Sequence, residues 1–163
     1  MIKYVDGDIL LSKAAAICHG VAPNDDFNQG LAFAVRERWP DLYKDFRHYC
    51  HTNSPKSGEV WLWRGVGNFA CFSLFTQDGS ERHHGHSHPG VASLQNVNHS
   101  LKELKKQAEK EDFNSIALPR LGCGVGKLAW EEVKTIIEKH FSDSSISVLV
   151  YENYVPNKPA KES

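Results

Sequence analysis

The sequence feature most suggestive of chemistry is a glycine-rich run that follows a short apolar segment. Glycine recurs at every second position from Gly122 to Gly126, and a helix-like pattern begins directly after Lys127. Glycine has no Cβ, so main-chain N–H groups can approach a ligand closely there. A helix N-terminus adds unpaired N–H donors and a partial positive charge. The run therefore predicts a phosphate site, although a strand-to-helix turn of this composition also occurs as plain architecture.

A second group of chemistry-bearing residues is the histidine-rich stretch 81–88, which reads Glu-Arg-His-His-Gly-His-Ser-His. Neutral histidine accepts a proton near pH 7, and its protonated form pairs with phosphate. The alternating His84, His86 and His88 would share one face of an extended segment and could bind Zn²⁺. A solvated polar loop, a substrate contact and a metal site all remain open. No acidic or cysteine ligand nearby strengthens the metal interpretation, so we predict neither a metal nor a cofactor.

The elements that must position these residues follow from the apolar periodicity. Strand-like runs alternate with amphipathic helical patterns, and this order predicts an α/β fold with helices on both faces of a mixed or parallel sheet. Ligands of such folds bind beyond the carboxyl ends of the strands. We therefore expect the loops after Cys18, Thr76 and Leu118 to meet at one cleft. Strands are predicted at 2–5, 14–18, 59–63, 69–76, 115–118 and 146–151, and helices at 31–39, 41–50, 91–108 and 130–141.

Length and charge indicate one globular domain without a general affinity for nucleic acid. The chain has 163 residues, with 19 Lys and Arg against 20 Asp and Glu. A nucleic-acid binder usually carries a basic excess, which this chain lacks. We predict a single domain over residues 1–154. Residues 155–163 mix prolines with charges and are predicted to form a flexible tail.

Cysteine usage bears on the compartment. The four cysteines are scattered without a C-x-x-C pair, and the N-terminal residues lack the apolar core of a signal peptide. No apolar run reaches the length that spans a membrane. We therefore expect free thiols, a cytoplasmic location and no membrane partner.

Four segments together resemble the macro domain family of ADP-ribose-binding modules. The similarity covers about residues 2–152. It is greatest to the subgroup of terminal ADP-ribose protein glycohydrolases, bacterial DNA ADP-ribosyl glycohydrolases and ADP-ribose-1″-phosphate phosphatases. The resemblance implies a three-layer α/β/α fold with a mixed central sheet. The segments that carry it are Tyr4-Val-Asp-Gly-Asp-Ile9, 19–32, Ser73-Leu-Phe-Thr76, and Leu118-Pro-Arg-Leu-Gly-Cys-Gly124 with Trp130-Glu131.

The resemblance implies an ADP-ribose site shared among these segments. Asp8 would accept a hydrogen bond from the adenine amino group, or it is a turn or N-cap residue. Phe27 would lie against the distal ribose, or it is buried. The other implied ligand contacts are Ile9 beside the adenine, Val21, Gly30 and Thr76 around the cleft, and Leu121, Gly122, Cys123, Gly124, Val125 and Gly126 at the diphosphate and distal ribose.

The sequence departs from the family pattern where the ADP-ribosyl-glutamate glycohydrolases carry their catalytic groups. Gln77 stands where they have a nucleophilic lysine, and Gly126 stands where they have an acid–base aspartate. In the first loop only Gly30 remains of the usual glycine cluster. Lysine-dependent glycohydrolysis is therefore disfavoured.

Several functions remain open for the expected ADP-ribose site. One is hydrolysis of ADP-ribose-1″-phosphate or of an ADP-ribosylated target, with His19, Asp25 and His84 as candidate acid–base groups. His19 could equally hold its loop in place by hydrogen bonding. Another is a non-catalytic reader of ADP-ribosylated protein or nucleic acid, and a third is binding of a different nucleotide.

Overall fold

The computed structural model describes residues 1–79 and 89–163. The histidine-rich stretch, including the catalytic candidate His84, lies outside the described residues.

A mixed six-stranded sheet, in the order β1-β8-β7-β2-β4-β3, forms the centre of the fold. Every neighbouring pair is parallel except β3 with β4, which form an antiparallel hairpin. A separate two-stranded ribbon joins β5 to β6. The strands are β1 (Ile2–Gly7), β2 (Ala16–Val21), β3 (Val60–Arg64), β4 (Ala70–Phe75), β5 (Gln77–Gly79), β6 (Pro89–Ala92), β7 (Ser115–Leu118) and β8 (Ser147–Tyr154).

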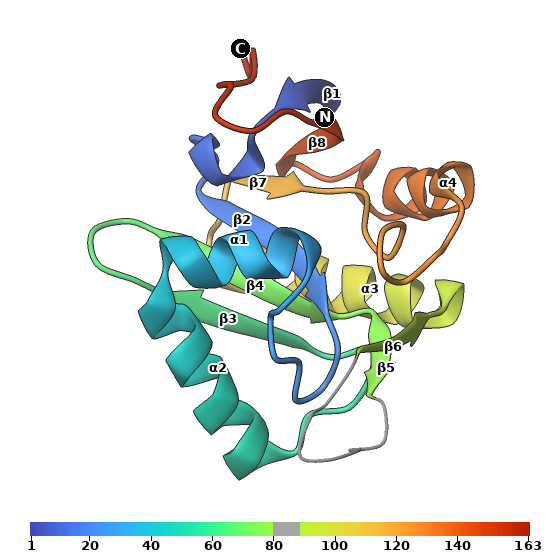
Figure 1. Cartoon of the computed structure of the whole chain (residues 1–163). Coiled ribbons are helices and arrows are strands. Elements are labelled where there is room, and N and C mark those ends of the chain that lie inside the picture. The colour runs from blue at the N-terminus through green and yellow to red at the C-terminus, as the bar shows by residue number, and fades with distance from the viewer. Residues whose placement is uncertain (80–88) are drawn as a thin grey trace.

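Helices cover both faces of this sheet, which confirms the predicted three-layer α/β/α fold. Figure 1 shows α1 (Gly30–Arg38) and α2 (Pro40–Asn53) on one side, with α3 (Leu94–Lys110) and α4 (Trp130–Phe141) on the other. A short 3₁₀ helix, η1 (Ile9–Leu11), follows β1. Pro40 opens α2 in its first turn, where a missing N–H costs nothing.

The third helix starts later than its apolar spacing predicts. Val91 belongs to β6, and α3 begins at Leu94 after Ser93, whose side chain accepts a hydrogen bond from the Asn96 N–H. The N-cap hydroxyl satisfies a main-chain donor that the helix leaves unpaired, so the cap sets the boundary.

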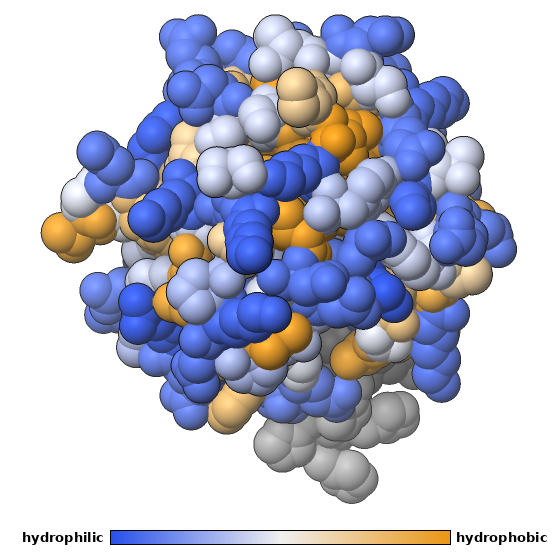
Figure 2. Space-filling model, turned by 90° about the horizontal axis from the view of Figure 1, so that it is seen from above, coloured by the Kyte–Doolittle hydropathy of each residue, from blue (hydrophilic) through white to orange (hydrophobic). Residues whose placement is uncertain are grey.

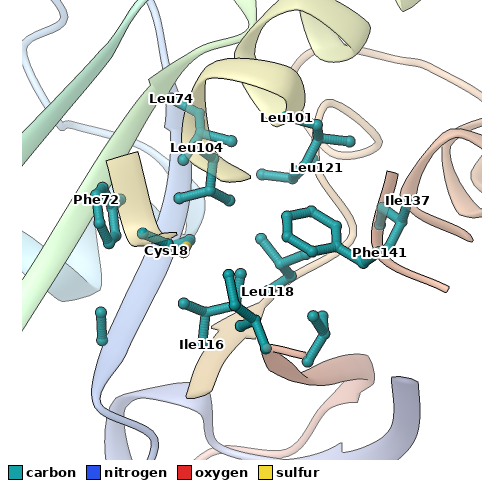
Figure 3. Packing of buried hydrophobic residues seen from close by; sticks show 14 of the residues in the cluster. Cys18, Phe72, Leu74, Leu101, Leu104, Ile116, Leu118, Leu121, Ile137 and Phe141 are labelled. Atoms are coloured by element: carbon teal, nitrogen blue, oxygen red, sulfur yellow. The ribbon is translucent and has the colours of Figure 1, made fainter. Parts of the chain in front are cut away.

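Strand β4 supplies both hydrophobic cores because successive side chains of a strand point to opposite faces. Phe72 and Leu74 pack with α3 and α4, whereas Cys71 and Phe75 pack with α1 and α2. Figure 3 shows the first core, where Phe72 and Leu74 of β4 lie on one side and Phe141 of α4 lies on the other.

The last nine residues, predicted to be a flexible tail, lie against β1 and η1 instead. The Val155 N–H donates to the Gly7 carbonyl at 3.0 Å, and Ala160 packs on the second core. Glu162 accepts hydrogen bonds from Ser12 and Tyr151. Figure 1 shows the C-terminal end of the chain, in red, near β1. The partners of this segment are distant in sequence, so its composition gave no sign of them.

Among residues 1–79 and 89–163, no helix is both long and apolar enough to cross a membrane. The face in Figure 2 is mostly hydrophilic, with apolar side chains in small areas rather than one broad patch.

Candidate ligand-binding site

Two adjoining cavities lie beyond the carboxyl ends of the parallel strands. The first has a volume of about 350 Å³ and the second about 380 Å³. Gly30, Leu31, Pro119 and Arg120 line both, so the two cavities adjoin along these residues, and together they are called the groove. This is the edge at which the sequence predicts a cleft.

The glycine-rich loop forms one wall of the first cavity, which residues 119–126 line without a gap. The Leu128 N–H donates to the Gly122 carbonyl at 2.8 Å and closes the loop. Within the described part of the chain, the N–H groups of Gly122, Gly124, Val125 and Gly126 have no acceptor. These amides are therefore available to an anion in the cavity.

The N-terminus of α1 forms a second source of donors at the same cavity. The helix begins at Gly30, and its N-cap residue Gln29 makes no side-chain hydrogen bond to the first turn. Gln29, Gly30, Leu31 and Ala32 all line the first cavity. The uncapped first turn adds N–H donors and a partial positive charge to those of the glycine loop.

The three glycines of the loop have different structural roles. A Cβ on Gly126 would lie 2.6 Å from both the Ala92 Cβ and the Gly122 carbonyl oxygen. Gly122 has a φ of +72°, and its Cβ would lie 2.9 Å from Leu128. Gly124 has nothing within 4 Å. The outer two glycines thus permit the fold of the loop, whereas the middle one leaves open space.

The second cavity has a more apolar wall. It is lined by Ile9 after β1, by Leu31 and Ala34 on α1, and by Tyr151 and Tyr154 on β8. A concave surface of aliphatic and aromatic side chains suits a planar, largely apolar group such as a base.

Asp8 caps η1 beside the second cavity but is not among the residues that line it. The residue as a whole is 5% exposed. Oδ1 accepts a hydrogen bond from the Leu10 N–H at 3.0 Å, and Oδ2 accepts one from the Asn157 N–H at 2.9 Å. Asp8 is therefore an N-cap residue in this structure.

His19 lies inside β2, which runs to Val21, and not in the loop predicted to begin there. The ring is 1% exposed, and its Nε2 lies 2.7 Å from the Ser73 Oγ on β4. Burial lowers the pKa of His19 to about 3. The ring therefore stays neutral near pH 7 and lines neither cavity, so its position suits holding the strands together better than acid–base chemistry.

Asp25 lines the first cavity and bonds within its own loop rather than to His19. Its carboxylate accepts hydrogen bonds from the main-chain N–H groups of Ala22 at 3.0 Å and Phe27 at 2.9 Å. Burial raises the pKa of Asp25, and these two hydrogen bonds offset only part of the increase. A carboxyl with a raised pKa in a cavity is a candidate proton carrier.

Three other predicted ligand contacts are buried instead. Val21, Phe27 and Thr76 are each 0% exposed, and none lines either cavity. Phe27 packs against the rings of His19, Tyr43 and Phe46. Tertiary packing places this ring in the second core, as the alternative prediction of a buried Phe27 has it.

The sequence of this chain matches the model of a known protein family. The macro domain model matches residues 40–137 of the chain, which is more than half of its length. The chain belongs to the macro domain family. The human ADP-ribose glycohydrolase OARD1 is 24% identical over 92% of this macro domain and 90% of its own length. Fungal ADP-ribose 1″-phosphate phosphatases match at 22% and 23% identity over 85% of the chain.

Solved structures agree with this assignment. The macrodomain of Thermus aquaticus DarG superposes with a TM-score of 0.81 at 26% identity, covering 93% of this macro domain and 98% of that chain. Thermosipho africanus DarTG, solved in complex with ADP-ribose, gives a TM-score of 0.80 at 22% identity. This macro domain spans 42% of that DarTG chain and 41% of the curated Thermus aquaticus DNA ADP-ribosyl glycohydrolase.

The aromatic pair Tyr151 and Tyr154 on β8 lines the groove of this macro domain although neither residue was predicted to contact a ligand. Gln77 at the start of β5, which stands where relatives have a lysine, and Arg120 beside the glycine loop also line the groove. Arg120 directly precedes the glycine loop, which is the one local signal for it. The tyrosines carry no such signal, because only the pairing of β8 with β1 brings them near Ile9.

Among the described residues, no group of three His, Cys, Asp or Glu side chains is placed to hold a metal ion. The histidines considered for zinc, His84, His86 and His88, lie outside the described residues.

Proposed function

We propose that this macro domain binds ADP-ribose or a close derivative along the groove formed by the two cavities. The observation that carries the proposal is the set of unpaired main-chain donors around the first cavity. The glycine loop and the first turn of α1 both contribute to it. A diphosphate carries two adjacent negative charges and needs many donors, which this arrangement supplies without a metal ion.

The two ends of the groove suit the two ends of ADP-ribose. The apolar cavity would take the adenine, between Ile9 and the tyrosines of β8. The distal ribose would lie at the other end, where Asp25 and Gln77 offer polar groups. Arg120 lines both cavities and would meet the ligand between them. The ADP-ribose bound to the Thermosipho africanus relative supports this choice of ligand.

Isothermal titration calorimetry with ADP-ribose tests the proposal. We expect ADP-ribose to bind more tightly than AMP or ribose 5-phosphate, since each of these fills only part of the groove. NAD and ATP, used as competitors, test whether another nucleotide is preferred. The absence of heat and of any thermal shift at millimolar ADP-ribose would contradict the proposal.

A second candidate function is hydrolysis of ADP-ribose-1″-phosphate, in which water displaces inorganic phosphate and leaves ADP-ribose. The observation that favours it is Asp25, a carboxyl with a raised pKa in the wall of the first cavity. Phosphate release by the parent protein should be lost in Asp25→Asn while ADP-ribose binding remains. If the parent releases no phosphate, hydrolysis of this substrate is excluded, and a reader of ADP-ribosylated protein or nucleic acid is favoured over a phosphatase.

This site lacks the lysine and the aspartate on which lysine-dependent glycohydrolysis relies. Gln77 carries no charge, and a side chain on Gly126 would collide with Ala92 and Gly122. Replacing Gly126 by aspartate would therefore disturb the loop instead of supplying an acid–base group.

We also propose that the protein acts in the cytoplasm. All four cysteines are free, and burial raises the pKa of each thiol. Unpaired cysteines persist most readily in a reducing compartment. Immunoblotting of cell fractions tests this, and recovery of the protein outside the cytoplasm would contradict it.

A further inference from the structure

The C-terminal segment 155–163, here called the strap, exchanges two hydrogen bonds with Asp8, one to its main chain and one to its side chain. The Asp8 N–H donates to the Lys158 carbonyl at 2.7 Å, and the Asn157 N–H donates to the Asp8 Oδ2 at 2.9 Å. The strap lies so close to β1 that a Cβ on Gly7 would come within 2.8 Å of the Lys158 oxygen. The side chain of Asp8 is thereby held between its own turn and the strap.

A tight turn aims the Asn157 N–H at Asp8. The Lys158 N–H donates to the Val155 carbonyl at 3.3 Å, which closes the turn, and Pro156 and Asn157 occupy its two central positions. Asn157 has a φ of +63°, in the left-handed region that asparagine and glycine tolerate better than other residues. Proline followed by a residue of positive φ is the sequence pattern of a type II turn.

The far end of the strap is anchored independently. Glu162 accepts hydrogen bonds from the Ser12 hydroxyl at 2.5 Å, the Lys13 N–H at 2.9 Å and the Tyr151 hydroxyl at 2.6 Å. Burial alone would raise the pKa of Glu162, but these hydrogen bonds lower it overall. Tyr151 also lines the second cavity, so the anchor is joined to its wall.

Asp8 retains acceptor capacity while it is held in this way. A carboxylate has about four lone-pair sites, and two N–H bonds leave the others open. The residue as a whole is 5% exposed, and its neighbour Ile9 lines the apolar cavity. A fixed carboxylate accepts from an amino group and repels a carbonyl oxygen, so it can distinguish bases by their exocyclic group.

We infer that the strap is a positioning element that holds the Asp8 carboxylate for the amino group of adenine and thereby sets base selectivity. This inference rests on the proposed function and names the feature of the ligand that is selected. Asp8 makes the contact with the base, and the strap acts through Asp8.

Two substitutions of Asn157 test the inference because its side chain is exposed. Asn157→Val disfavours the positive φ and displaces the N–H, whereas the conservative variant Asn157→Gly permits the same backbone. The ligands are ADP-ribose and inosine diphosphate ribose, in which a carbonyl oxygen replaces the amino group. Glu162→Gln weakens the other anchor, because one of its two acceptor oxygens becomes a donor, and it serves as a second variant if Asn157→Val fails to fold.

We expect the parent and Asn157→Gly to prefer ADP-ribose by tenfold or more. In Asn157→Val and Glu162→Gln this ratio should fall towards one, mainly through weaker ADP-ribose binding. Equal weakening of both ligands would indicate a merely structural strap and overturn the inference. An unchanged ratio, tighter ADP-ribose binding in Asn157→Val, or a parent that does not discriminate would overturn it too. A parent that binds neither ligand contradicts the proposed function instead.

Discussion

The Gln77 Nε2 donates a hydrogen bond to the main-chain oxygen of Gly90 at 3.0 Å. This bond links β5 to β6 and fixes the amide in the wall of the first cavity. This bond uses one of the two amide hydrogens, so the other hydrogen and the side-chain oxygen are left for a ligand hydroxyl.

Replacing Gln77 by alanine should therefore affect both the ribbon and the ligand. We expect Gln77→Ala to lower the free energy of unfolding by about 1 kcal/mol, since one hydrogen bond is lost. Affinity for ADP-ribose should fall about tenfold. Urea unfolding and calorimetry measure the two effects, with Gln95→Ala, an exposed position on α3, as the control. An affinity equal to that of the parent would remove Gln77 from the site.

Arg120 is held above Trp130 and should contribute binding energy through its charge and shape. Its guanidinium carbon lies 5.5 Å from the centre of the Trp130 ring, and Nη2 donates to the Asn153 Oδ1 at 3.3 Å. We expect Arg120→Ala to weaken ADP-ribose binding about tenfold, and Arg120→Lys to recover only part, because lysine lacks the planar fork.

Salt provides a second readout for Arg120. Added salt should weaken binding by the parent more than binding by Arg120→Ala, because screening removes an attraction that the variant already lacks. Arg64→Ala, at an exposed pair with Glu111, is the control. Equal salt dependence in parent and variant would show that Arg120 does not face the diphosphate.

Gly124 and Gly126 form a matched pair for testing the glycine loop. Gly126→Ala should destabilise the fold by about 1–3 kcal/mol, because its Cβ would meet Ala92 and Gly122 at 2.6 Å. Gly124→Ala should leave stability within about 0.5 kcal/mol of the parent, since its Cβ would meet nothing within 4 Å. Thermal denaturation measures both.

The affinity of Gly124→Ala for ADP-ribose, compared with that of the parent, tests whether the ligand lies along this loop. If ADP-ribose lies along the loop, Gly124→Ala should weaken binding despite its normal stability, because the methyl group enters space that the ligand needs. Unchanged affinity in Gly124→Ala would place the ligand elsewhere.

His19 predicts a pH dependence of stability. Its pKa is 6.5 in the reference state and about 3 in the fold, because burial disfavours the charged ring. The unfolded chain binds a proton below pH 6.5 and the folded chain does not until about pH 3. Stability from this residue is therefore complete above pH 6.5 and decreases as the pH falls towards 3, by about 2 kcal/mol at pH 5.

Urea unfolding at pH 7 and pH 5 measures this loss. His19→Gln should be less stable than the parent at pH 7 but lose about 2 kcal/mol less on acidification. His48→Gln, which alters an exposed side chain of α2, is the control. The same loss in His19→Gln as in the parent would mean that other groups cause it.

Much of the fold could be predicted from local pattern. Strands β7 and β8 were predicted from their apolar runs, and α4 was predicted from its apolar stripe. These patterns mark the faces that each element buries in the first core. The helix break at Pro40 and the hairpin of β3 and β4 have equally local causes. The strand predicted at 14–18 is β2, which runs from Ala16 to Val21. The prediction missed its last three residues because they pair only with β4.

The candidate site could be predicted only in part. Its glycine loop could be identified because glycine at every second position, from Gly122 to Gly126, is itself the sequence signal for an unusual backbone. The roles expected for His19 and Phe27 depended on which side of a strand or loop each ring would face. Phe27 packs against Phe46 of α2, and His19 packs against Phe27, so both rings are buried.

The sequence by itself determined the layered α/β architecture and the place of the glycine loop, because periodicity and glycine act on neighbouring residues. Only the tertiary structure decided that the first turn of α1 shares a cavity with that loop and that Asn157 holds Asp8. Those contacts join residues far apart in the chain. Their geometry depends on how the sheet brings strand ends together, which no local pattern records.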